Sequence, residues 1–260
     1  MTAQPPSPVR ITLRTPGWTV QAHVTVPSEP GPIEAWMPLL QGLASRAAQA
    51  AEDAAEAEGR VVSCAKGCGA CCRQVVAISL VEARALAQLV ADLPEPRRSV
   101  IRTRFADGLN RIGESGVLAR DFPDAAPEAP LADTAHQRRG AAWFGLGVAC
   151  PFLEDESCSI HADRPLVCRE YLVTSPAPVC SRLYREPVDS LDLPVRISHA
   201  LAHATEKIAG VSVAMVPLMT ALQSTPAIDA ALAEPRDMIE MLEVILGEIG
   251  DWRIDGVETG

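Results

Sequence analysis

A chain of 260 residues, of which 48% are hydrophobic and 22% charged, can form one large domain or two small ones around a substantial apolar core. Aromatic residues make up only 4%, so aliphatic side chains must fill that core. Acidic residues outnumber basic ones by 33 to 23, and the net charge of −10 argues against broad nucleic-acid binding, which needs a basic surface.

The first half of the chain contains the patterns of one hairpin and three helices. Residues 9–26 alternate polar and apolar side chains around Pro16-Gly17, which predicts a β-hairpin. The alanine-rich residues 31–59 predict a helix whose start Pro38 delays or kinks. Ser79 and Glu82 fit a capping box for a helix over 80–93, and a second helix over 97–116 follows two prolines. The proline-rich residues 121–135 predict a loop.

The second half combines a short hairpin with helices. Polar residues 154–157 separate two apolar segments, which indicates a hairpin. We expect Asp163 to cap a short helix with Pro165 in its first turn, so that Cys168 lies near the positive end of the helix dipole, which favours a thiolate. Beyond that, residues 195–210, 212–224 and 235–250 predict helices, and the last has an apolar stripe of Ile239, Leu242, Leu246 and Ile249.

These elements predict a mainly α fold with a small N-terminal β-hairpin and an irregular, cysteine-lined metal-binding centre. We expect three parts: an N-terminal hairpin and helix over residues 1–60, a cysteine domain over 61–185, and a C-terminal helical region over 186–260 that packs on it. The chain starts without the apolar run of a signal peptide, and no stretch approaches the roughly 18 apolar residues of a membrane helix. A cytoplasmic protein with reduced thiols is therefore expected.

The cysteines fall into two groups, within residues 64–72 and within residues 150–180. They are Cys64, Cys68, Cys71, Cys72, Cys150, Cys158, Cys168 and Cys180. Disulfides are typical of small secreted proteins with cysteines throughout the chain, and a redox CxxC needs a βαβ context that is missing here. Gly67 and Gly69 can wrap a loop around an ion, and Lys66 and Arg73 would offset thiolate charge. We therefore expect both groups to meet at one metal site, with Cys180 the least certain ligand.

The same residues resemble the YkgJ-type cysteine-cluster family, a zinc- or iron-chelating domain. Its hallmark is a CxxCxxCC run followed by C-x-I-Y-x-x-R-P-x-x-C-R. Here "SCAKGCGACCR" and "CSIHADRPLVCRE" match both halves in order, and the resemblance covers roughly residues 61–182. The first spacing is one residue longer than in the family, and His161 replaces its tyrosine. Some members are similar to flagellin lysine N-methylase, so the resemblance implies an iron–sulfur cluster or zinc and, more weakly, methyl transfer.

The ligand types leave several arrangements open. Both zinc and iron–sulfur clusters accept four thiolates, so eight cysteines suit two zinc sites, one [4Fe–4S] cluster with spare thiols, or a cluster plus zinc. Neighbouring Cys71 and Cys72 point apart unless the backbone is kinked, so a multinuclear site or two nearby sites would use both. His161 is either a turn residue or an auxiliary ligand. His199 and His203 have helical i, i+4 spacing without the HExxH glutamate, which favours solvated or packed histidines.

Two roles are open for Arg164 and Arg169: pairing with Asp163 and Glu170, or donating to the sulfurs.

Three classes of function are consistent with these residues. They are a metalloenzyme for redox chemistry or methyl transfer to a protein substrate, a delivery protein that hands metal to an acceptor protein, and an interaction module whose fold zinc stabilises. An open coordination position would favour the enzyme, and an exposed, labile site would favour delivery. No acid–base pair or cosubstrate loop identifies a catalytic residue.

Overall fold

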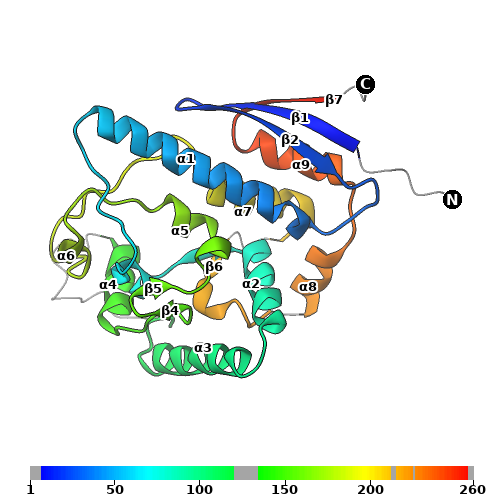
Figure 1. The fold of residues 1–260 in the computed structure, drawn as a ribbon. Coiled ribbons are helices and arrows are strands. Elements are labelled where there is room, and N and C mark those ends of the chain that lie inside the picture. Colours follow the sequence, from blue (N-terminus) through cyan, green and yellow to red (C-terminus); the bar gives the residue numbers. More distant parts are fainter. Residues whose placement is uncertain (1–6, 120–133, 212–214, 225, 257–260) are drawn as a thin grey trace.

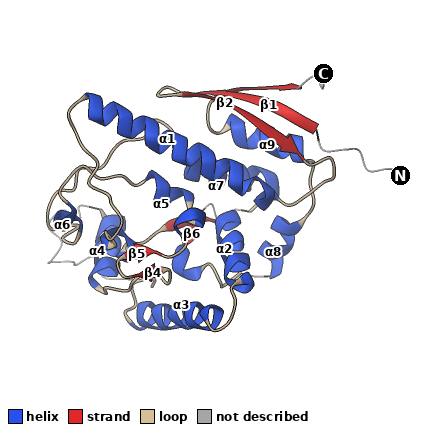
Figure 2. Cartoon of the chain, viewed as in Figure 1, coloured by secondary structure: helices blue, strands red, loops and turns tan. Residues whose placement is uncertain are grey.

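A computed structural model of the chain describes residues 7–119, 134–211, 215–224 and 226–256. The fold is mainly helical, as the sequence predicts, with a few short strands (Figures 1 and 2). The α-helices are α1 Met37–Ala57, α2 Leu80–Asp92, α3 Arg97–Glu114, α4 Ala135–Gly145, α5 Leu166–Glu170, α6 Ala177–Cys180, α7 Ile197–Ala209, α8 Pro226–Ala233 and α9 Met238–Gly247. The strands are β1 Ser7–Arg14, β2 Thr19–Val26, β3 Ala77–Ser79, β4 Leu153–Glu154, β5 Ser157–Cys158, β6 Met215–Pro217 and β7 Asp251–Gly256. Four 3-10 turns complete the fold: η1 Ile33–Trp36, η2 Ala70–Arg73, η3 His161–Asp163 and η4 Leu218–Thr220.

The two ends of the described chain share one antiparallel sheet of order β2-β1-β7. The predicted hairpin is confirmed, and Ile11 of its first strand pairs with Ala22 on one side and Ile254 on the other. Figure 1 shows this sheet beside α9. The sequence patterns did not indicate β7, because a strand added from the far end of the chain leaves no local turn signal.

A first apolar cluster connects this sheet with α1, α7 and α9. The buried residues of α1 recur every three or four positions, which is the period of a helix with one face in the core. Pro38 lies in the first turn of α1, where its missing N–H has no helical partner in any case, so it delays the helix rather than kinking it. In α9, Leu242 and Leu246 are fully buried and Ile239 is half-buried; Ile249, two residues beyond the end of the helix, is nearly fully buried.

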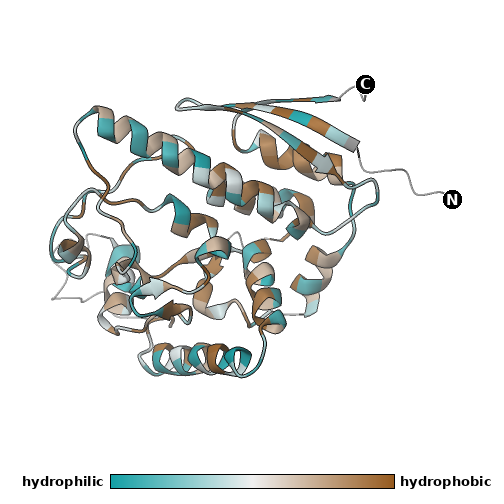
Figure 3. Ribbon diagram, in the orientation of Figure 1, coloured by the Kyte–Doolittle hydropathy of each residue, from teal (hydrophilic) through white to brown (hydrophobic). Residues whose placement is uncertain are grey.

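A second apolar cluster lies among α2, α3, α4 and the β4–β5 hairpin. The capping box of α2 is confirmed, because Glu82 N donates to Ser79 Oγ and Ser79 N donates to the Glu82 carboxylate. Helix α3 turns a polar outer face to solvent (Figure 3). The short hairpin is also confirmed: Asp155 and Glu156 both have positive φ, the conformation of a tight two-residue turn.

One predicted helix is wrong, and one expectation falls outside the described residues. Residues 215–220 form strand β6 and turn η4 instead of a helix, because the backbone of β6 pairs with β3 beside the cysteine segment. The predicted loop over 121–135 lies mostly in residues 120–133, which the structure does not describe. Among the described residues, none of the helices combines the length and apolarity needed to cross a bilayer.

Candidate metal centre

Tight turns shape the first cysteine group. Residue Gly67 adopts a φ of +91°, which an L side chain rarely tolerates, and the next turns close through Cys68 N to Ala65 O and Cys72 N to Gly69 O, both 3.1 Å. Turn η2 contains Cys71 and Cys72, and it supplies the kink that neighbouring cysteines need to face one side. Their two thiols are hydrogen-bonded to each other.

The second cysteine group lies against the first. The amide of Cys150 donates to the carbonyl oxygen of Cys72 over 2.7 Å, which joins the two groups through the backbone. Farther out, Ser63 N donates to Val173 O at 2.8 Å, and Ser63 Oγ donates to Ser175 O at 2.5 Å. These bonds hold the segment before Cys64 beside the segment that leads into α6. The structure thus brings together the two segments that the sequence placed at one site.

The remaining cysteines occupy short elements around η2. Cys158 lies on β5, Cys168 is the third residue of α5, and Cys180 ends α6, which packs on η2. All eight cysteines are free thiols, as expected for a metal site rather than a disulfide framework. Cys64 is exposed, Cys180 is buried, and the other six are half-buried.

Burial and the nearness of other sulfurs raise the pKa of several of these thiols. Burial, with smaller contributions from the charges of Cys158 and Cys71, raises the pKa of Cys150 to about 12. A hydrogen bond from Cys72, followed by burial, raises the pKa of Cys71 well above its ordinary value. Burial likewise raises the pKa of Cys168, so the expectation that its helix position yields a thiolate is wrong: desolvation outweighs the dipole of a five-residue helix. A bound metal would reverse this balance, because coordination deprotonates a thiol.

The charge of a nearby arginine lowers the pKa of some of these cysteines and so opposes the effect of burial. The charge of Arg164 lowers the pKa of Cys64, Cys71 and Cys158 against the effect of burial. The Nε of Arg164 is buried without a hydrogen-bond partner among the described residues. Arg169 instead donates to the carbonyl oxygens of Ala162 and Arg164, so it anchors the turn before α5 rather than pairing with an acid.

Two buried carboxylates hold α5 in place. Pro165 precedes the helix without a side-chain cap, so the expected cap by Asp163 is wrong; Asp163 lies in η3 instead. The cap comes from another helix: Glu82 Oε1 accepts from Leu166 N at 2.8 Å while Oε2 accepts from Ser79. At the other end of α5, Glu170 accepts from Ser198 N at 3.1 Å and from Ser198 Oγ, which fixes α5 to the start of α7.

Sequence patterns did not assign these two carboxylates to the site. Glu82 was recognised only as part of its own capping box, and Glu170 only as a partner for an arginine. Both are 1% exposed, so an unpaired carboxylate there would be costly, and each is matched with buried N–H donors. Only the fold shows that those donors belong to α5 and α7.

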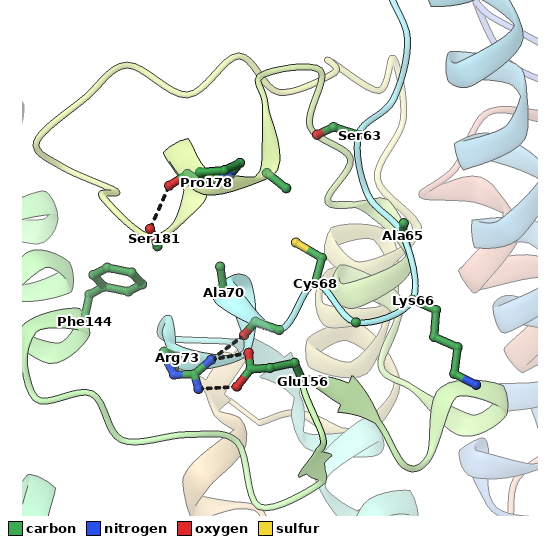
Figure 4. Close-up of a pocket in the computed structure, with 13 residues that line it drawn as sticks. Ser63, Ala65, Lys66, Cys68, Ala70, Arg73, Phe144, Glu156, Pro178 and Ser181 are labelled. Carbon is green, nitrogen blue, oxygen red and sulfur yellow. Dashed lines mark hydrogen bonds and ion pairs between the residues drawn. The ribbon is translucent and has the colours of Figure 1, made fainter.

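An open cavity of about 710 Å³ lies on one side of the cysteines (Figure 4). Small residues form most of its wall, and Figure 4 shows the Cys68 sulfur directed into the space between Ser63, Phe144 and Ser181. Arg73 forms a two-pronged ion pair with Glu156 at its floor, with N–O distances of 2.7 and 3.0 Å. The Lys66 amine points away from the cavity.

The donor set fits a thiophilic ion, although the side chains must rearrange to bind one. Within the described ranges, no three Cys, His, Asp or Glu side chains stand in positions that hold a metal ion. Eight free thiols, two of them in contact, are nevertheless ligands that zinc and iron–sulfur clusters prefer.

His161 begins η3 at the surface, and Arg164 lowers its pKa; its role as a ligand stays a prediction. His199 and His203 are exposed on α7, and His203 lies 3.7 Å from Glu248.

The fold and site together define a helical protein with a cysteine-lined centre suited to soft metal ions. Residues 63–184 match the CxxCxxCC family, described as a "putative zinc- or iron-chelating domain". This segment holds all eight cysteines, and its match to that family's model agrees with the resemblance seen in the sequence. No curated protein and no solved structure matches the chain.

Proposed function

We propose that residues 63–184 bind metal through cysteine thiolates, as an iron–sulfur cluster or as zinc. The observation that carries the proposal is the 2.7 Å bond from Cys150 N to Cys72 O, which brings two distant groups of thiols to one place. The family description supports metal binding in general. The ligands we assign are Cys64, Cys68, Cys71, Cys72, Cys150, Cys158, Cys168 and Cys180.

The contact between the thiols of Cys71 and Cys72 favours a centre with more than one metal ion. Two adjacent sulfurs strain the tetrahedron around a single zinc ion, whereas a cluster or two adjoining ions can use both. Such a centre supplies electron transfer or Lewis-acid chemistry, according to the metal. The open cavity beside Cys68 supports a site that a partner can reach rather than a purely structural one.

The open cavity gives another protein access to the cysteines, and we propose a biological role on that basis. The protein acts in the cytoplasm on another protein, either as a metalloenzyme for redox chemistry or methyl transfer, or by handing metal to an acceptor protein. A module in which zinc only stabilises the fold is the alternative, and it would leave the cavity without a role. Catalytic residues are not assigned, since no acid–base pair lies in the cavity apart from the ion-paired Arg73 and Glu156.

Anaerobic purification followed by metal and sulfide analysis and an absorption spectrum tests the proposal. A brown protein with iron and sulfide that bleaches in air would support a cluster, and a colourless protein with stoichiometric zinc would support zinc. Cys168→Ala should lose bound metal, whereas Val167→Ala on the same short helix should retain it. Wild-type protein that contains neither metal, and takes up neither on reconstitution, would refute the proposed function.

A further inference from the structure

Six of the eight thiols divide into two groups according to what surrounds the segments that carry them. The outer group consists of Cys64, Cys68 and Cys180, and the inner group consists of Cys150, Cys158 and Cys168. Cys71 and Cys72 lie between them on η2. Contacts of the surrounding backbone define this division. The inference drawn from it rests on the proposed metal-binding function.

Contacts around the outer group tie its members to one wall. Ser63 is bonded to Val173 O and Ser175 O, so the segment before Cys64 runs beside the segment that enters α6. Helix α6, which ends at Cys180, packs on η2. The neighbours of all three outer cysteines line the same large cavity: Ser63 and Ala65 beside Cys64, Gly67 and Gly69 beside Cys68, and Ser181 beside Cys180.

Around the inner group the surroundings are closed. Cys72 and Cys150 line a void of only about 10 Å³, roughly the space of one water molecule, next to Trp143 and Met219. Cys150 and Cys158 pack against the second apolar cluster. Val167, the neighbour of Cys168 on α5, packs against the same cluster. Among the described residues, a cavity of about 710 Å³ therefore opens onto Cys68 of the outer group, whereas Cys72 and Cys150 border only the small void.

We propose that the domain contains two metal sites: an enclosed inner site that retains its metal, and an outer site that exchanges a thiophilic divalent ion through the large cavity. Cys72 completes the inner set, because it shares the small void with Cys150, and Cys71 completes the outer set. Zinc is the ion whose tetrahedral thiolate geometry four such ligands satisfy. The outer site is then the place where the protein accepts metal or passes it to a thiol-bearing partner.

Chelator competition on the full-length protein tests this division. Protein with its metal bound is mixed with excess 4-(2-pyridylazo)resorcinol, and the metal released and the metal retained are both measured over time. Wild type should release metal in a fast and a slow phase. Cys68→Ser and Cys180→Ser should abolish the fast phase and keep the slow one, whereas Cys158→Ser should remove the slowly released metal. Ser181→Ala, which removes a hydroxyl rather than a sulfur from the same cavity wall, should behave as wild type.

Release in a single phase, or equal loss of all metal in outer and inner variants, would overturn the two-site division while leaving the proposed metal binding intact. Wild-type protein without metal would refute the proposed function itself, and the division with it. Because an inner substitution can prevent folding, Cd²⁺ is also titrated into the metal-free wild type. The thiolate-to-Cd²⁺ absorption should then rise in two steps of different affinity, and one step would contradict the proposal.

Discussion

Two regions of this molecule are held together by different means. In the terminal region, defined as residues 7–57, 197–211 and 226–256, long helices and a sheet bury one continuous apolar cluster. In the cysteine region, residues 63–184, the elements that carry cysteines have between two and five residues: η2, β5, α5 and α6. Figure 2 shows how much of the chain around these elements is loop.

Short elements cannot fix their own positions, because a single helical turn is not stable alone. In the cysteine region, specific polar contacts therefore add to the second apolar cluster in positioning the short elements that carry cysteines. The carboxylate of Glu82 joins the starts of α2 and α5, and Glu170 joins α5 to α7. The positions of the thiols therefore depend on a few buried hydrogen bonds and, after a metal has bound, on the metal as well.

Metal removal should separate the two regions most strongly. A metal bound by cysteines contributes on the order of 10 kcal/mol to a small domain, which is comparable with the total stability of most proteins. We expect chelation to raise hydrogen exchange in residues 63–73 and 150–180 while α7 and α9 retain protection. Hydrogen-exchange mass spectrometry before and after chelation measures this. Equal deprotection of both regions would show that they unfold as one unit and would contradict the comparison.

Replacing Glu82 with glutamine should weaken the cysteine region selectively. A glutamine side chain can still complete the capping box of α2, but it has only one acceptor oxygen and cannot also accept from Leu166 N. Loss of that buried, charged hydrogen bond should cost about 2 kcal/mol. We expect a lower melting temperature, faster exchange in α5 and reduced metal content, but unchanged exchange in α2.

The matched control for this variant is Glu243→Gln, on the exposed face of α9. It makes the same chemical change in the terminal region and should leave stability and metal content as in wild type. If Glu82→Gln keeps full metal content and normal exchange in α5, the carboxylate does not position Cys168.

Arg164→Met should weaken metal binding without unfolding either region. The guanidinium charge favours the thiolate forms of Cys64, Cys71 and Cys158, and thiolates are the forms that bind metal. A methionine of similar length keeps the packing and removes that charge. Because residues around metal ligands typically change affinity 10- to 100-fold, we expect affinity to fall about tenfold in a chelator competition. Arg102→Met, an exposed residue of α3, changes the net charge equally and should have no effect.

Local patterns predicted the elements whose signals lie within a few residues. The Ser79–Glu82 capping box, the Pro16-Gly17 hairpin and the helical period of α1 all specify structure through neighbouring residues, and all three are confirmed. Strand β6 was mistaken for a helix because its three residues are paired by β3, far away in sequence. Strand β7 was missed for the same reason.

The site shows the same limit. Spacing identified all eight cysteines as a group that would meet, and the Cys150–Cys72 bond shows the two segments meeting. Nothing in the sequence indicated that Glu82 would cap α5, since the two residues joined by that bond are 84 positions apart. The sequence also gave no means of dividing the thiols into two groups, because that division depends on which segments border the large cavity and which border the second apolar cluster.

The smallest expected effect concerns the ion pair that joins the two parts of the cysteine region at its surface. Arg73 on η2 bonds Glu156 in the β4–β5 turn, but both side chains are partly exposed, at 31% and 51%. Water screens such pairs, so Glu156→Gln should leave the melting temperature within about 2 °C of wild type. The Arg73 charge, no longer balanced by Glu156, lies near Cys72 and attracts a negatively charged metal–thiolate centre, so metal should be released slightly more slowly, not faster. Glu234→Gln, which breaks the exposed Arg236 pair of the terminal region, should leave release unchanged. Rapid metal loss from Glu156→Gln would show that this pair, rather than the buried carboxylates, holds the cysteine segments together.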